Sequence, residues 1–180
     1  GDPGNHMHRA LDNFPVPEIA NRLISKYFIS SGKGSDTPYK AIPKYSITPG
    51  KRLQELTIAA NFIEVWLAKE GHAGPVGINL LEKIQYPNIY SLYGAMLAGV
   101  DYVLMGAGIP RDIPGVLDKL AQHEEATLRI NVANTKKGEN FHARLVPREI
   151  IPLDLPCLKR PEFLAIVSSS TLATTLAKKS

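Results

Sequence analysis

The first part of the chain carries apolar side chains at helical spacing. Between residues 15 and 28, Ile19, Leu23 and Phe28 fall near one face, which predicts an amphipathic helix that opens on Pro17. The next segment, residues 29–47, is rich in Gly, Ser, Pro and Lys and is expected to form a loop.

A second, longer helix is predicted between Thr48 and Gly71. Thr48 can cap this helix, and Pro49 suits the first turn, where a missing N–H costs nothing. Gly71 can end the helix in the left-handed conformation. Apolar residues cover so much of the helix surface that we expect it to be well buried. Residues 1–72 thus form a helical and loop segment.

From residue 75 onward, short apolar runs alternate with helical segments. The runs cover residues 76–80, 101–105 and 163–167, and the helices cover residues 87–98, 112–122 and the stretch after Ser168-Ser169-Ser170 to Ser180. Such βα units, at 75–122 and 162–180, are typical of a parallel sheet covered by helices. The sequence therefore predicts an α/β fold, with Ser169 or Ser170 as N-cap of the last helix.

One stretch departs from this rhythm. Residues 127–132 and 141–146 alternate apolar and polar side chains at a period of two, and the polar segment 134–140 between them contains Gly138. This pattern predicts a two-stranded β-hairpin with one polar face, inserted at about 126–147.

Composition and charge exclude several classes of protein. No apolar run approaches the roughly 20 residues that cross a bilayer, and the polar N-terminus does not resemble a secretory signal. The single cysteine, Cys157, excludes an internal disulfide and fits a reducing cytoplasm. The net charge is only +4 and the basic residues are scattered, so we expect no nucleic-acid binding.

Candidate chemistry lies where the predicted parallel strands end, because ligands bind at that edge of such sheets. Asn79 follows apolar neighbours, and its amide could meet a heterocycle or only satisfy local backbone. Gly106-Ala107-Gly108 could approach a phosphate or a flat ring, or serve only as a tight turn. Ser168-Ser169-Ser170 could contact a cofactor, although a helix cap is the simpler interpretation.

The histidines do not indicate a metal centre or a catalytic triad. His6 and His8 lie two residues apart, whereas His72, His123 and His142 stand alone, and no CxxC or HExxH motif is present. For His72 we expect a surface role near the negative end of the preceding helix.

Long stretches of the chain resemble the nitronate monooxygenase (2-nitropropane dioxygenase-like) family. The resemblance is carried by residues 68–79, which end in Gly77-Ile78-Asn79 where the family has Gly-Val-Asn, and by residues 91–110, which include Gly106-Ala107-Gly108. Residues 1–7 and 163–173 are similar to internal sequence of the longer bacterial members.

The resemblance implies an FMN-dependent (β/α)8 TIM barrel that oxidises alkyl nitronates with O₂, with the hairpin as an insertion. It places Asn79, Gly106 and Gly108 at the flavin and makes the substrate a small anion. Flavin enoyl-thioester reductases share this barrel but use NAD(P)H, so the fold alone does not choose the reaction. A third hypothesis is a non-catalytic scaffold that makes protein contacts through the hairpin.

The resemblance also implies that parts of the barrel lie outside this sequence. The family's Gly-Gly-Met flavin turn would precede Gly1, and its Gly-Gly-His segment would follow Ser180, so no catalytic role passes to any histidine here. We therefore expect an internal, inactive fragment, an incomplete barrel over residues 1–180. Its sheet would have open edges and an unclosed core, so we expect the isolated chain to be unstable unless it pairs with another copy as a homo-oligomer.

Overall fold

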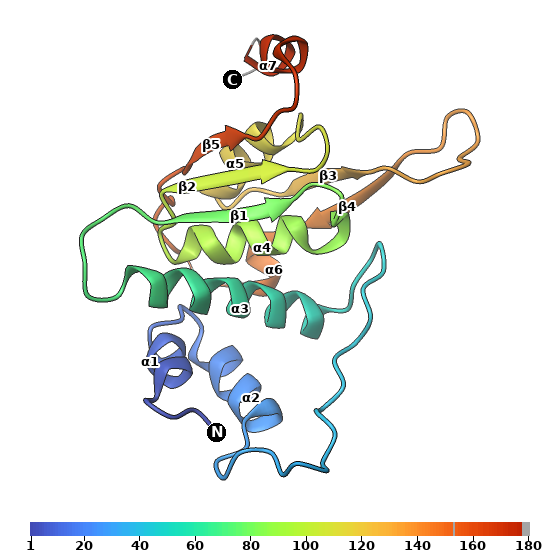
Figure 1. Cartoon of the computed structure of the whole chain (residues 1–180). Helices are drawn as coiled ribbons and strands as arrows, with labels where there is room; N and C mark the ends of the chain where they lie inside the picture. The colour runs from blue at the N-terminus through green and yellow to red at the C-terminus, as the bar shows by residue number, and fades with distance from the viewer. Residues whose placement is uncertain (153, 178–180) are drawn as a thin grey trace.

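The computed structural model describes residues 1–152 and 154–177 and contains a parallel sheet, a hairpin and a helical N-terminal segment (Figure 1). The elements are α1 (His6–Asp12), α2 (Pro17–Tyr27), α3 (Lys51–Lys69), β1 (Gly77–Leu81), α4 (Gln85–Leu97), β2 (Tyr102–Gly106), α5 (Ile113–Ala121), β3 (Ala126–Ile130), β4 (Phe141–Leu145), α6 (Pro147–Ile150), β5 (Glu162–Ala165) and α7 (Ser170–Ala177).

The parallel sheet has the strand order β1-β2-β5, and the hairpin forms a separate two-stranded sheet. Asn79 of β1 lies opposite Leu104 of β2, and Val103 lies opposite Phe163 of β5. The predicted α/β class is therefore confirmed. Among the described residues both sheets are open, and β1 and β5 each leave one edge of the parallel sheet unpaired.

The two faces of the parallel sheet differ sharply in burial. One face packs on helices, and its residues Val103 and Met105 are fully buried. We call the other face the uncovered face; its residues alternate along each strand with those of the helix-covered face. Its large apolar side chains are exposed: Leu81 by 44%, Tyr102 by 38%, Leu164 by 47% and Ile166 by 49%. Parallel sheets almost always have both faces covered, so this face lacks the packing that such a sheet normally has.

Helices α3 and α4 form the most extensive packing in the molecule, and Gly94 makes their close approach possible. A Cβ atom at Gly94 would lie 2.2 Å from the carbonyl oxygen of Ile58 on α3. Ile58 and the neighbouring Tyr93 are almost completely buried. On the far side of α3 lie α1 and α2, so α3 is packed on two sides, as its largely apolar surface predicts (Figure 1).

The predicted hairpin is confirmed. Strands β3 and β4 pair antiparallel, with Arg129 opposite His142. Ala126, Leu128 and Ile130 are buried while the residues between them are exposed, which gives the polar face that the period of two predicts. The hairpin packs on α4, where the hydroxyl of Tyr90 donates a hydrogen bond to the carbonyl of Arg144 at 3.0 Å.

The observed ends of helix α3 match the predicted ends in part. Gly71 has φ +83°, the left-handed conformation predicted for it after α3. The predicted start of α3 is wrong: the helix begins at Lys51 with Gly50 as N-cap, and the Gly50 carbonyl accepts the N–H groups of Leu53 and Gln54. Thr48 therefore lies outside the helix. Gly50, in an extended conformation, takes the N-cap position instead.

The last helix begins as predicted, since the Ser169 hydroxyl accepts the N–H of Leu172 at 3.2 Å. The predicted continuation of this helix to residues 178–180 lies outside the described residues. Two short helices, α1 and α6, are additions to the predicted set. Among the described residues, no helix combines the length and the apolar composition that a membrane crossing requires.

Candidate functional site

Asn79 lies on the uncovered face of the sheet. It is the third of the five residues of β1 and is exposed, and the strand ends at Leu81, one residue beyond the predicted run 76–80. Within the described part of the chain, its side-chain amide has no hydrogen-bond partner. The amide is therefore available to a ligand, and it can both donate and accept hydrogen bonds.

The two predicted glycines lie at different places. Gly106 ends β2 on the uncovered face, where a Cβ atom would lie 3.0 Å from the Cβ of Ile166. Gly108 lies beyond the strand, where a Cβ atom would be 1.9 Å from a carboxylate oxygen of Glu82. A larger residue at position 108 would require the Glu82 side chain to move. The structure therefore places Asn79 and Gly106 on one face, and Gly108 beside a cavity.

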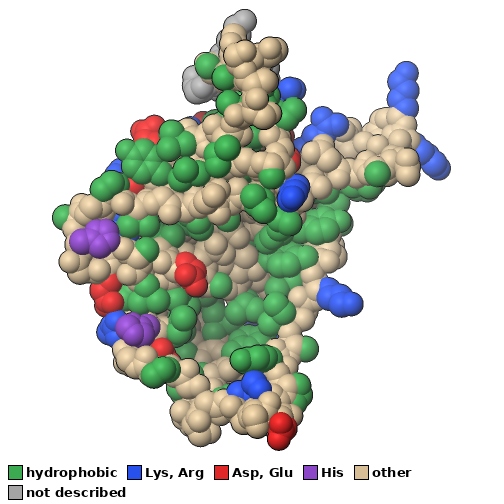
Figure 2. All heavy atoms as spheres, in the orientation of Figure 1, with side chains coloured by type: hydrophobic (Ala, Val, Ile, Leu, Met, Phe, Trp, Pro, Cys, Tyr) green, Lys and Arg blue, Asp and Glu red, His purple; other side chains and the backbone are tan. Residues whose placement is uncertain are grey.

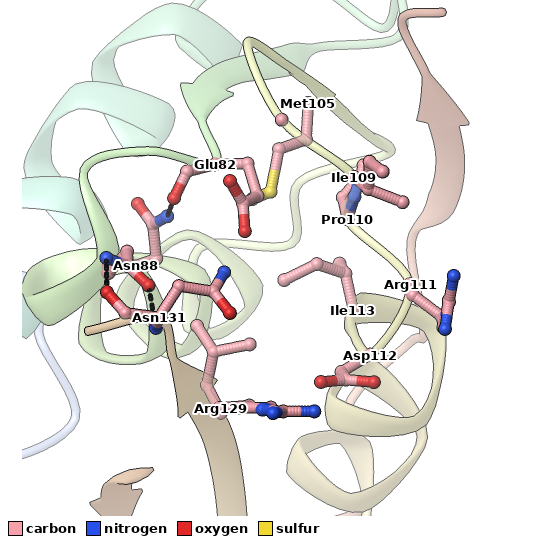
Figure 3. A pocket seen from close by; sticks show the side chains of 13 residues that line it. Glu82, Asn88, Met105, Ile109, Pro110, Arg111, Asp112, Ile113, Arg129 and Asn131 are labelled. Atoms are coloured by element: carbon pink, nitrogen blue, oxygen red, sulfur yellow. Dashed lines mark hydrogen bonds between the residues drawn. The ribbon is translucent and has the colours of Figure 1, made fainter. Parts of the chain in front are cut away.

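This cavity lies at the carboxyl ends of β1 and β2 and has a volume of about 430 Å³ (Figure 3). We call it the strand-end cavity. Its walls come from the turn after β1, the turn between β2 and α5, and strand β3. The lining residues are Glu82, Gln85, Asn88, Met105, Gly108, Ile109, Pro110, Arg111, Asp112, Ile113, Leu128, Arg129 and Asn131.

Two side-chain amides fix the walls of the cavity. Asn88, which is buried at the start of α4, donates to the carbonyl of Leu81 at 3.0 Å and so holds the turn after β1. Gln85 donates to the carbonyl of Asn131 at 3.1 Å and accepts the N–H of Asn131 at 2.5 Å. The amide of Gln85 thus pairs with the hairpin backbone as a neighbouring strand would.

Four charged side chains line the strand-end cavity: Glu82, Arg111, Asp112 and Arg129. None of them forms an ion pair or a side-chain hydrogen bond with another described residue. Glu82 extends into the cavity from one side, and Arg129 and Asp112 lie on the opposite side (Figure 3). The cavity can therefore meet positive and negative groups of a ligand on different walls.

The sequence alone did not single out Glu82 or Arg129. Arg129 belongs to the exposed face of a hairpin strand, a position that usually carries solvated charge. Its place beside a cavity depends on how the hairpin packs against α4 and α5. The only signal in the sequence was the position of Glu82 immediately after a strand end.

His72 and His123 make structural contacts. Gly74 donates its N–H to Nδ1 of His72 at 3.0 Å, so Nε2 carries the hydrogen and donates to the carbonyl of Ala68 at 2.7 Å. This contact at the end of α3 confirms the predicted surface role. His123 bonds Tyr93 at 2.8 Å and the carbonyl of Pro156 at 3.0 Å. In the described ranges, no three His, Cys, Asp or Glu side chains gather in a way that could hold a metal ion.

Comparison with known proteins found no relative of this chain. No family model, no curated protein and no solved structure matches this chain. The resemblance to nitronate monooxygenases therefore stays a prediction, and what is proposed for the chain rests on its residues and their geometry.

Proposed function

We propose that this chain forms one section of an FMN-binding (β/α)8 barrel oxidoreductase of the nitronate monooxygenase type. The observation that carries the proposal is the uncovered apolar face of the parallel sheet. In such a barrel the helices pack outside the strands, and the inner face is filled by side chains from the other strands. The sheet β1-β2-β5 has helices on one face only, as a barrel section would.

The residues of the uncovered face suit a barrel interior. Leu81, Tyr102, Leu164 and Ile166 are large apolar side chains of the kind that fill barrel layers, yet each is more than a third exposed here. The unpaired edges of β1 and β5 offer backbone N–H and C=O groups to further strands. Additional strands at these edges would bury the face and satisfy both edges at once.

Asn79 and Gly106 are the residues that fit FMN. The unpartnered amide of Asn79 on the inner face has both a donor and an acceptor for the edge of the flavin ring. Gly106 ends the adjacent strand and brings its backbone to the same face without a side chain. Gly108 is a weaker candidate because it lies against the Glu82 carboxylate, which would repel a flavin phosphate.

Bound FMN would supply the oxidation of the nitronate and the reaction with O₂. This chain would contribute the Asn79 contact and the apolar wall that excludes water from the flavin. No described residue is assigned as a catalytic base: His72 and His123 make the structural contacts given above, and the resemblance transfers no catalytic role to any histidine here.

The test is to measure FMN content and nitronate-dependent O₂ uptake for this chain and for a complete barrel that contains it. We expect flavin and O₂ uptake in the complete barrel and neither in the 180-residue chain. In the complete barrel, Asn79→Ala should weaken FMN binding by about tenfold, the effect of losing one or two good hydrogen bonds. Asn21→Ala, at an exposed position of α2, is the matched control.

Three results would contradict the proposal. Flavin binding and turnover by the 180-residue chain alone would show that further barrel strands are not needed. Bleaching of the flavin by NAD(P)H without nitronate oxidation would indicate an enoyl-thioester reductase instead. A stable oligomer without flavin in either protein would indicate a scaffold.

A further inference from the structure

The strand-end cavity is a second candidate site, separate from the uncovered face. Met105, which lines the cavity, belongs to the helix-covered face of β2, whereas Gly106 belongs to the opposite face. The cavity therefore opens on the side of the sheet that carries α5 and the hairpin. Asn79 and Gly106, the residues proposed to contact FMN, do not line the cavity.

The charged side chains that line this cavity sum to zero, but they form no ion pairs with one another. The lining has two arginines, Arg111 and Arg129, and two carboxylates, Glu82 and Asp112, so its formal charge sums to zero. Elsewhere the chain pairs comparable groups closely, as in Arg144–Glu125 at 2.6 Å. Glu82 is partly buried, and it has no partner among the described residues. Its carboxylate is therefore free to pair with a ligand cation.

The opposed positions of Glu82 and Arg129 define what the ligand must carry. A group bound to Glu82 is a cation or a hydrogen-bond donor, and a group bound to Arg129 is an anion. Because the two carboxylates balance the two arginines, the lining as a whole favours neither an anion alone nor a cation alone. The volume of about 430 Å³ lies within the range of small-molecule sites.

We propose that the strand-end cavity binds a small zwitterion, with its ammonium group on Glu82 and its anionic group on Arg129. The anionic group is a carboxylate or a phosphate, since arginine binds both in the same two-pronged geometry. The fixed walls favour such a ligand because Asn88 and Gln85 hold the two sides of the cavity in place without it. This preorganisation lowers the cost of binding.

The experiment is titration of the 180-residue chain with defined probes, followed by amide chemical shifts and by calorimetry. Phosphoethanolamine and γ-aminobutyrate are the zwitterionic probes, one with a phosphate and one with a carboxylate. Inorganic phosphate and ethylamine are the single-charge controls. We expect saturable binding of at least one zwitterion, with shifts at Glu82 and Arg129, and about tenfold weaker binding of each single-charge probe.

Two variants test the assigned contacts. Arg129→Gln should weaken the zwitterion by about tenfold, and Glu82→Gln should remove its advantage over inorganic phosphate. Lys136→Gln at the hairpin tip and Glu64→Gln on the exposed surface of α3 make the same charge changes outside the cavity, and should leave binding unchanged. Circular dichroism and thermal unfolding of each variant establish that it is folded.

The outcomes separate the alternatives. Tighter binding of phosphoethanolamine than of γ-aminobutyrate identifies the anionic group as a phosphate, and the reverse identifies a carboxylate. Equal binding of inorganic phosphate and phosphoethanolamine that Glu82→Gln leaves unchanged would overturn the zwitterion. Absence of saturable binding by the folded wild-type chain would overturn the site. Neither result bears on the proposed flavin, because no probe requires it.

Discussion

Asp101 joins three segments of the chain that are distant in sequence. Its carboxylate accepts a hydrogen bond from the Lys69 ammonium group at the end of α3 at 2.7 Å, and from the N–H of Val76 at 3.0 Å. It also accepts one from Lys159, before β5, at 2.9 Å. The hydrogen bond from Lys69, followed by those from Val76 and Lys159, holds the pKa of Asp101 well below its usual range. The network fixes the beginnings of the three parallel strands relative to α3.

This shift predicts a pH dependence of the unfolding free energy. A carboxylate whose pKa is lowered on folding stabilises the folded state fully above its unfolded pKa, about 3.9 for Asp. That contribution falls as the pH drops below this value toward the folded pKa. Wild-type stability should therefore decrease between pH 5 and pH 3, which urea unfolding followed by circular dichroism measures. Asp101→Asn should be less stable at pH 7 and lose less on acidification.

The control is Asp36→Asn, in the exposed loop between α2 and α3, where no such network exists among the described residues. A pH dependence in Asp101→Asn as steep as that of the wild type would show that other groups cause the acid loss. Asp2 is the other carboxylate to include, because the hydrogen bond from His8 lowers its pKa to about 2.

Local signals in the sequence predicted residue roles where one residue controls its own backbone. Gly71 and Ser169 were assigned correctly because a left-handed residue and a capping hydroxyl act within a few residues. Thr48 was assigned wrongly: the helix begins at Lys51 with Gly50 as N-cap, and no side-chain hydrogen bond caps it. The cavity charges were missed for a different reason. Glu82 and Arg129 meet only after the hairpin has packed.

At the scale of elements, the crossing of α3 and α4 depends on a glycine inside a helix. Gly94 occupies an interior position of α4, where alanine has the better helix propensity. The close contact with the Ile58 carbonyl explains why glycine is nevertheless needed there. The sequence predicted both helices but not this crossing, because periodicity defines a helix face and not the partner that it meets.

Gly94→Ala should therefore destabilise the chain by about 1–3 kcal/mol, because the added methyl group forces α3 and α4 apart. Gly115→Ala is the matched control, since nothing lies within 4 Å of a Cβ atom at that exposed position of α5. It should be neutral or raise the free energy of unfolding by about 0.5–1 kcal/mol through helix propensity. Urea unfolding measures both. Equal effects of the two substitutions would mean that the helices do not cross at Gly94.

At the scale of the whole molecule, helices cover one face of the parallel sheet and leave the uncovered face exposed. Figure 2 shows apolar side chains gathered at the surface of the upper part of the molecule, in the region of the parallel sheet in Figure 1. The sequence predicted the parallel βα units and the hairpin because each follows from a local period. The exposure of the uncovered face could not be predicted in this way. An apolar run has the same pattern whether one face or both are buried.

The uncovered face gives the barrel proposal its sharpest test. Leu164 lies on the edge strand β5 and is 47% exposed, so Leu164→Lys should change the unfolding free energy of the 180-residue chain by less than about 0.5 kcal/mol. The same substitution in a complete barrel would place an unpaired ammonium group in the interior and cost about 3–5 kcal/mol. Val132→Lys, at a residue beyond β3 that is 43% exposed, should be tolerated in both proteins. Urea unfolding and bound FMN measure these effects. If Leu164→Lys leaves the complete protein as stable and as rich in flavin as Val132→Lys does, this face is not the inside of a barrel, and the flavin proposal loses the observation that carries it.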